Sequence, residues 1–78
     1  MNQISITILY FAVFRERKGK EAEQLNIESD TTVSTLFMKL FQTSDQSIRY
    51  AVNEEFVEPE TLLEEGDVVA FIPPLGGG

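Results

Sequence analysis

The sequence predicts a single small α+β domain in which a mixed β-sheet wraps around one long helix. Short segments with alternating apolar residues occur at both ends of the chain, and one central segment carries a helical apolar stripe. No linker or internal repeat divides the 78 residues. One amphipathic helix covers only one face of a sheet, so the pattern favours an α+β architecture over a sheet covered on both faces.

Two strands and a short helix are predicted in the first part of the chain. Residues 4–10 alternate between apolar residues on one face and mainly polar residues on the other, as in a half-buried strand. Residues 11–18 have a helical pattern, and Gly19 is placed to end that helix. A second strand is predicted over residues 23–28.

Residues 32–41 form the best predicted helix, because their apolar residues recur at i, i+3, i+4, i+7 and i+8. The stripe consists of Val33, Leu36, Phe37, Leu40 and Phe41. Thr32 is a suitable N-cap, since its hydroxyl can accept a hydrogen bond from a backbone N–H of the first turn. We interpret the stripe as core rather than as a ligand site.

Three more strands are predicted in the second half. They cover residues 48–52, 56–57 and 68–72. A polar loop at 43–47 precedes the first of them, and a turn at 53–55 joins it to the second. A helical turn at 60–64 and the turn Gly66-Asp67 then lead to the last strand.

The last strand is apolar on both faces. Val69 and Phe71 point one way, whereas Val68, Ala70 and Ile72 point the other. One set fills the core, and the other is left for a partner or for a helix that the pattern does not predict. A small domain rarely exposes a contiguous apolar patch without a use, so we expect a partner to bind there.

The composition restricts the classes of function. Six basic against 13 acidic residues give a net charge of −7, which argues against binding nucleic acid through its phosphates. The chain has no cysteine and no histidine, so it lacks the commonest nucleophile, general base and metal ligand. This residue set argues against an enzyme that works alone. No segment has the pattern of a signal peptide or the length of a membrane span, so a cytoplasmic protein is expected.

Two charged clusters have simple interpretations beside functional ones. The acidic cluster consists of Glu54, Glu55, Glu58, Glu60, Glu64, Glu65 and Asp67. Its spacing matches no calcium loop, so no metal site is predicted. The basic cluster consists of Arg15, Arg17, Lys18 and Lys20. It is interpreted as a solvated helix end, and the alternative is docking to an acidic partner.

The C-terminal sequence Phe71-Ile72-Pro73-Pro74-Leu75-Gly76-Gly77-Gly78 suggests a function of its own. The two prolines stop the strand and favour an extended exit. Glycine has no Cβ, so a terminal glycine carboxylate can enter a narrow channel of another enzyme. We expect a tail that presents a reactive acyl group, with Pro73, Pro74 and Leu75 contacting a partner together with Ala70 and Ile72. The alternative is an inert tail.

Several of these motifs together resemble one family. They are Leu9-Tyr10-Phe11-Ala12 with Arg15-Glu16 and Gly19, Ala51-Val52-Asn53, Gly66-Asp67 with the strand after it, Pro73-Pro74, and Gly77-Gly78. Over nearly its whole length the chain resembles the small subunit of molybdopterin synthase, the sulfur carrier MoaD.

The resemblance implies a ubiquitin-like β-grasp fold over residues 1–74, with a mixed sheet of about five strands and a flexible glycine tail at residues 75–78. It also implies that a MoeB-like adenylyltransferase uses ATP to adenylate the Gly78 carboxylate. A sulfur donor enzyme then converts the adenylate to a thiocarboxylate. A MoaE-like large subunit, in a heterotetramer, transfers the sulfur to precursor Z (cyclic pyranopterin monophosphate). Gly76 and Gly77 give clearance, the catalytic residues lie on the large subunit, and this chain binds no cofactor itself.

Two departures from the family pattern are visible, at Glu54 and at Gly76, and only the first has a structural consequence; two alternatives for the function also stay open. The family commonly has glycine after Asn53, where this chain has Glu54, so a positive φ at that position would strain the turn. One alternative is a sulfur carrier of another pathway, such as the thiamine carrier ThiS or a carrier for tRNA thiolation. The thiamine carrier usually lacks the helical segment that residues 11–19 supply here. The other alternative is a non-covalent ubiquitin-like interaction module.

Overall fold

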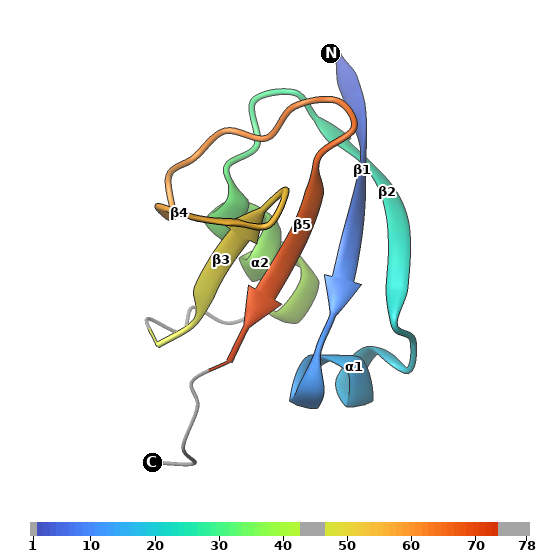
Figure 1. Cartoon of the computed structure of the whole chain (residues 1–78). Coiled ribbons are helices and arrows are strands. Elements are labelled where there is room, and N and C mark those ends of the chain that lie inside the picture. The colour runs from blue at the N-terminus through green and yellow to red at the C-terminus, as the bar shows by residue number, and fades with distance from the viewer. Residues whose placement is uncertain (1, 43–46, 74–78) are drawn as a thin grey trace.

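A computed structural model describes residues 2–42 and 47–73 of the chain. This part contains five strands and two helices, in the order strand, helix, strand, helix and three strands (Figure 1). They are β1 (Gln3–Tyr10), α1 (Ala12–Lys18), β2 (Ala22–Glu28), α2 (Val33–Phe41), β3 (Arg49–Val52), β4 (Glu55–Val57) and β5 (Val68–Ile72). The predicted α+β order is confirmed, with Gly19 ending α1 at φ 73° and Thr32 capping α2.

The predicted helical turn at residues 60–64 is wrong. Backbone groups of this segment bond to residues at the start of α2 and just before it. The N–H of Val33 donates to the carbonyl of Thr61 over 2.9 Å, and the N–H of Leu63 donates to the carbonyl of Thr31 over 3.1 Å. Leu62 thereby forms an isolated antiparallel bridge with Thr32. These tertiary hydrogen bonds override the weak local helical tendency. Most of the predicted loop at 43–47 lies outside the described residues.

The five strands form one mixed sheet in the order β2-β1-β5-β3-β4. The central strands β1 and β5 are parallel, with Tyr10 beside Phe71, and the other neighbouring pairs are antiparallel. Helix α2 lies against one face of the sheet, and α1 lies at the end where β1 and β5 finish (Figure 1). The residue that leaves β5 is therefore close to the start of α1.

The core lies between α2 and the sheet and is rich in aromatic rings. Phe37 of α2 contacts the rings of Phe14, Tyr50 and Phe71 at centroid distances of 5.6, 6.1 and 5.1 Å, each edge to face. Phe37, Phe71 and Val69 are at most 1% exposed. The apolar stripe of α2 is thus core, as predicted, and it holds β5 in a fixed position.

A hydrogen bond links the core to the edge strand β2. The Tyr10 hydroxyl donates to Oε1 of Glu23 over 2.8 Å, and Lys20 Nζ lies 3.4 Å from Oε2 of the same carboxylate. The hydrogen bond from Tyr10 is the largest reason that the pKa of Glu23 lies below its ordinary value of 4.5, and the charge of Lys20 adds to it. Burial is the main reason that the pKa of Tyr10 is raised.

This arrangement predicts part of the pH dependence of stability. Because the pKa of Glu23 is lower in the folded chain than in the unfolded chain, its contribution is fully present above pH 4.5 and is lost as the pH falls through the lowered value. We expect the unfolding free energy of Glu23→Gln to fall less steeply below pH 4.5 than that of the wild type. Urea unfolding at a series of pH values measures this, with Glu16→Gln as the charge-matched control. Parallel curves for wild type and Glu23→Gln would contradict the assignment.

The β3–β4 hairpin turns at Asn53 and Glu54, and both have positive φ, at 54° and 71°. A two-residue turn with positive φ at both positions is of the type I′ kind, in which the second position favours glycine. The strain expected at Glu54 is thus confirmed, because a left-handed conformation costs a non-glycine residue about 1 kcal/mol or more.

We therefore expect Glu54→Gly to raise the unfolding free energy by about 1 kcal/mol, after allowance for the greater freedom of glycine in the unfolded chain. Glu55→Gly is the matched control, because Glu55 lies in β4, its φ is not positive, and glycine there weakens a strand. Chemical denaturation of the three proteins measures both changes. An unchanged or lowered stability for Glu54→Gly would show that the turn is not strained.

Candidate docking groove and the root of the tail

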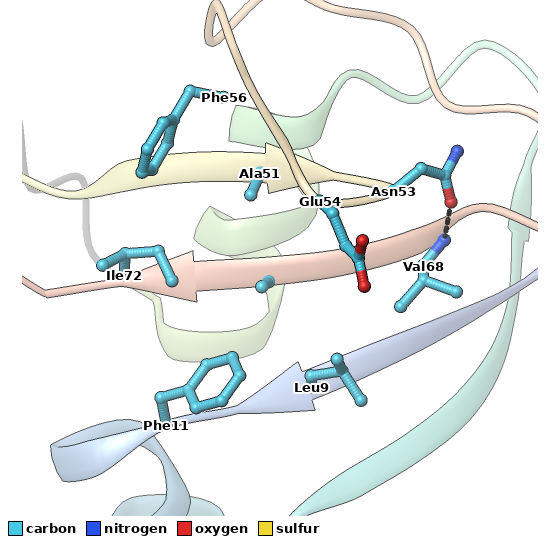
Figure 2. Close-up of a pocket in the computed structure, with 9 residues that line it drawn as sticks. Leu9, Phe11, Ala51, Asn53, Glu54, Phe56, Val68 and Ile72 are labelled. Carbon is cyan, nitrogen blue, oxygen red and sulfur yellow. Dashed lines mark hydrogen bonds between the residues drawn. The ribbon is translucent and has the colours of Figure 1, made fainter.

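An apolar groove of about 520 Å³ lies on the face of the sheet opposite α2 (Figure 2). Side chains from β1, β3, β4 and β5, and from the segments that follow β1 and β3, line it. The lining residues are Leu9, Phe11, Ala51, Asn53, Glu54, Phe56, Val68, Ala70 and Ile72. We call this surface the docking groove.

The alternation of β5 creates the groove. Val69 and Phe71 are fully buried on the α2 side, and Val68, Ala70 and Ile72 line the groove on the other side. The two-sided apolar strand predicted from the sequence is thus confirmed, and Figure 2 shows α2 behind the sheet when the groove faces the viewer. The second face of β5 is left open by the two described helices.

Small residues form the floor of the groove and aromatic rings form its sides. Ala70, which is 9% exposed, pairs with Leu9 on one side and with Ala51 on the other. Phe11 and Phe56 stand at opposite sides and are 43% and 65% exposed. Exposed aromatic rings around a shallow apolar floor are typical of protein–protein contacts rather than of an enclosed ligand site.

Hydrogen bonds fix the polar end of the groove. Asn53 Oδ1 accepts from the N–H of Val68 over 3.0 Å, and Asn53 Nδ2 donates to Oδ1 of Asp67 over 3.0 Å. Asp67 Oδ2 accepts from the N–H of Glu64 over 2.8 Å. The motif residues Asn53 and Asp67 therefore tie the β3–β4 turn to the start of β5, and they hold Glu54 at the rim of the groove.

Six of the residues that line the groove were not predicted to contact a partner. They are Leu9, Phe11, Ala51, Asn53, Glu54 and Phe56. The available signals were an apolar Leu9 on the otherwise polar face of the first strand, and the adjacent Phe11. Joining them to Ala51 and Phe56 required the strand order, because β5 enters between β1 and β3 from the far end of the chain.

The basic cluster lies at the end of α1 and also contacts α2. Lys18 Nζ donates to the carbonyl of Leu40 over 3.3 Å, and the Arg17 guanidinium lies 5.1 Å from the ring centroid of Phe41. Lys18 therefore satisfies one carbonyl group at the C-terminal end of α2, where a positive charge is favourable. The interpretation as a helix end is confirmed for these two residues, and docking to an acidic partner stays a prediction.

Neither a metal site nor a membrane span is found within residues 2–42 and 47–73. No group of three or more potential metal ligands occurs there, and no helix there is long and apolar enough to cross a membrane. Two members of the acidic cluster have structural partners instead. Glu65 Oε1 accepts from the N–H of Ser5 over 2.9 Å, and Asp67 makes the bonds given above.

The model of the ThiS family matches residues 8–78 of this chain. The chain belongs to the ThiS family. The molybdopterin synthase sulfur carrier subunit of Mycobacterium tuberculosis is 33% identical over 82 residues, covering 96% of this chain and 99% of that protein. The protein of the same name from Escherichia coli is 33% identical over 81 residues, covering 94% and 99%. The resemblance stated from the motifs is thus confirmed.

Solved structures confirm the fold of this ThiS-family protein. SAMP1 from Haloferax volcanii has a TM-score of 0.78 at 22% identity, covering 95% of this chain and 99% of that one. A ubiquitin from Caldiarchaeum subterraneum has a TM-score of 0.65 at 15% identity, covering 99% and 100%. At these identities the likeness shows the fold alone, which is the expected ubiquitin-like β-grasp.

The predicted site residues of this ThiS-family protein fall into two groups. Ala70 and Ile72 line the docking groove, and Pro73 follows Ile72 directly and is half-buried. The remaining positions, Pro74, Leu75, Gly76, Gly77 and Gly78, lie outside the described residues. The division at residue 74 between domain and tail also stays a prediction. What the structure does show is that the groove extends to the last residue of β5.

Proposed function

We propose that this ThiS-family protein is the sulfur carrier subunit of a molybdopterin synthase. The observation that carries the proposal is the position of the docking groove, which extends to Ile72, the last residue of β5. A partner bound in the groove therefore lies close to Pro73, from which the chain leads to the tail expected at residues 75–78. The names of the near-full-length relatives supply the pathway.

In the proposed reaction, the chain's own contribution is the Gly78 carboxylate at its C-terminus. A carboxylate oxygen attacks the α-phosphorus of ATP on a MoeB-like adenylyltransferase, which releases pyrophosphate and leaves an acyl-adenylate. AMP is a better leaving group than an oxide, so sulfide-level sulfur supplied by a donor enzyme attacks the acyl carbon, a C–S bond forms, and AMP leaves as the C–O bond breaks. The product is a C-terminal thiocarboxylate. Gly76 and Gly77 allow this group to pass through a narrow opening in each partner.

The thiocarboxylate then delivers its sulfur to precursor Z on the large subunit, and hydrolysis restores the carboxylate. Two such transfers form the dithiolene of molybdopterin. The chain has no cysteine and no histidine, which is consistent with this scheme. The sulfur is held on the acyl carbon of this chain, and the groups that transfer protons belong to the large subunit.

The proposed partner is a MoaE-like large subunit that binds in the docking groove. One solved relative in fold is a complex of subunits 1 and 2 of molybdopterin-converting factor from Helicobacter pylori, with a TM-score of 0.60 and 21% identity to this chain, covering 96% of this chain and 100% of that one. We propose the same pairing here, with Ala70, Ile72, Pro73, Pro74 and Leu75 in the contact. The MoeB-like enzyme, the sulfur donor enzyme and a cytoplasmic location are further parts of the proposal.

The helix α1 favours this pathway over thiamine synthesis. It follows the first strand, where the family resemblance implies a helical segment in molybdopterin synthase carriers.

Reconstitution tests the choice of pathway directly: the chain loaded with sulfur is incubated with the large subunit and precursor Z, and molybdopterin is assayed. We expect product only when all three are present. A loaded chain that forms no product, yet supports thiamine synthesis or tRNA thiolation, would assign it to another pathway.

A further inference from the structure

Glu54 combines three properties that a surface residue rarely has together. Its φ of 71° is strained for any residue except glycine. It lines an otherwise largely apolar groove, and Figure 2 shows its side chain reaching from the β3–β4 turn across β5. Within the described part of the chain, its carboxylate has no hydrogen-bond or ion-pair partner.

The hydrogen bonds around the turn keep this carboxylate in place. The preceding residue, Asn53, is bonded to Asp67 and to the backbone of Val68, and its own N–H donates to the carbonyl of Val68 over 2.8 Å. The backbone of Glu54 is therefore held at one end of the groove. A strained conformation fixed by its surroundings is the kind that often marks a functional position.

Docking of a partner removes water from the groove and also from part of Glu54. A carboxylate that loses water without gaining a cation opposes binding, whereas a cation presented by the partner reverses the effect. Arg49 pairs with Ile72 and so lies on this face of the sheet, but its guanidinium lies 5.4 Å from the ring centroid of Phe56 and forms no ion pair with Glu54 in the described part of the chain. The compensating charge must then come from the partner.

We propose that Glu54 is a specificity-determining residue, and that the protein partner of the docking groove presents an arginine or lysine side chain to it beside an apolar ridge. This inference rests on the proposed function, since it takes the large subunit as that partner. The ion pair between Glu54 and the partner's cation fixes the orientation of the partner. Apolar contacts with the floor of the groove are not directional, so alone they allow the partner to bind in several positions along the groove.

The test is the affinity of the intact chain for the large subunit, measured by calorimetry at low and raised salt. We expect Glu54→Gln to raise Kd about tenfold at low salt and to weaken the salt dependence, and Glu54→Lys to raise Kd further. Glu55→Gln is the matched control. It removes the same charge one residue away, but Glu55 pairs with Val52, whose side chain packs on the core side of the sheet.

The outcomes separate this inference from the proposed function. If Ala70→Glu abolishes binding but Glu54→Gln binds within about twofold of wild type, the groove docks the large subunit and the role of Glu54 is wrong. If the wild type does not bind the large subunit at all, the proposed function itself is contradicted. If the chain instead forms a dimer that Ala70→Glu disrupts, a second copy occupies the groove and the inference is overturned.

Discussion

Removal of Gly77 and Gly78 is expected to abolish sulfur-carrier function completely while leaving the fold intact. Every step of the proposed reaction takes place on the carboxyl carbon of the last glycine, so no other group of the chain can replace it. The described core residues come from β1, α1, α2, β3 and β5, together with Ile48 and Leu63, and all of them precede Pro73. We expect the unfolding free energy to change by less than about 0.5 kcal/mol.

Complementation of a strain that lacks the small subunit measures the functional loss, and thermal unfolding measures the stability. A second variant keeps all three glycines and adds one alanine after Gly78. It should be equally inactive, because the added residue displaces the carboxylate and brings a Cβ to the reacting end. Restored cofactor synthesis by the truncated chain would rule out every carrier mechanism and would favour a non-covalent interaction module.

Ala70→Glu is expected to raise the Kd for the large subunit at least about 100-fold. Ala70 lies at the floor of the docking groove between Leu9 and Ala51. A longer, charged side chain at this position would clash with the apolar surface that the partner places in the groove. Its carboxylate would also be buried in the complex without a cation beside it. The groove is open on the outer face, so the carboxylate can reach water in the free protein.

The control for this variant is Leu62→Glu, which places the same charge on another exposed apolar residue outside the groove lining. Its affinity should equal that of the wild type. Phe56→Glu provides a second test that does not depend on a buried position, since Phe56 is 65% exposed. Wild-type affinity in both groove variants, with folding verified by circular dichroism, would show that the partner binds elsewhere.

The sequence was most informative where local and tertiary preferences agree. The stripe of α2, the Thr32 cap and the Gly19 stop were all predicted from spacing and residue type, and the structure contains each of them. The two-sided β5 was equally clear, because its five consecutive apolar residues cannot all face one core. The helical turn predicted at 60–64 is wrong because the conformation of that segment is set by backbone hydrogen bonds to Thr31 and Val33. These two residues are distant in the sequence, so the local pattern carries no signal of the bonds.

The groove could be predicted only in part. Ala70 and Ile72 follow from the alternation of one strand. Phe11, Ala51 and Phe56 belong to the same surface only because β5 lies between β1 and β3, and a pairing between distant segments has no local signature. The sequence predicted a strained backbone at Glu54 if its φ is positive. Its place in the lining of the groove could be recognised only from the three-dimensional arrangement of the strands.

The central claim is that Gly78 carries sulfur as a thiocarboxylate, and mass spectrometry of the intact protein tests it most directly. The protein is purified from cells that contain the adenylating and sulfur-donating enzymes, treated with a thiol alkylator, and weighed whole and after digestion. Because the chain contains no cysteine, a single adduct that maps to Gly78 can come only from a terminal thiocarboxylate, and this is the result we predict. An unmodified mass, even after incubation with the adenylyltransferase, ATP and the sulfur donor, would contradict the claim.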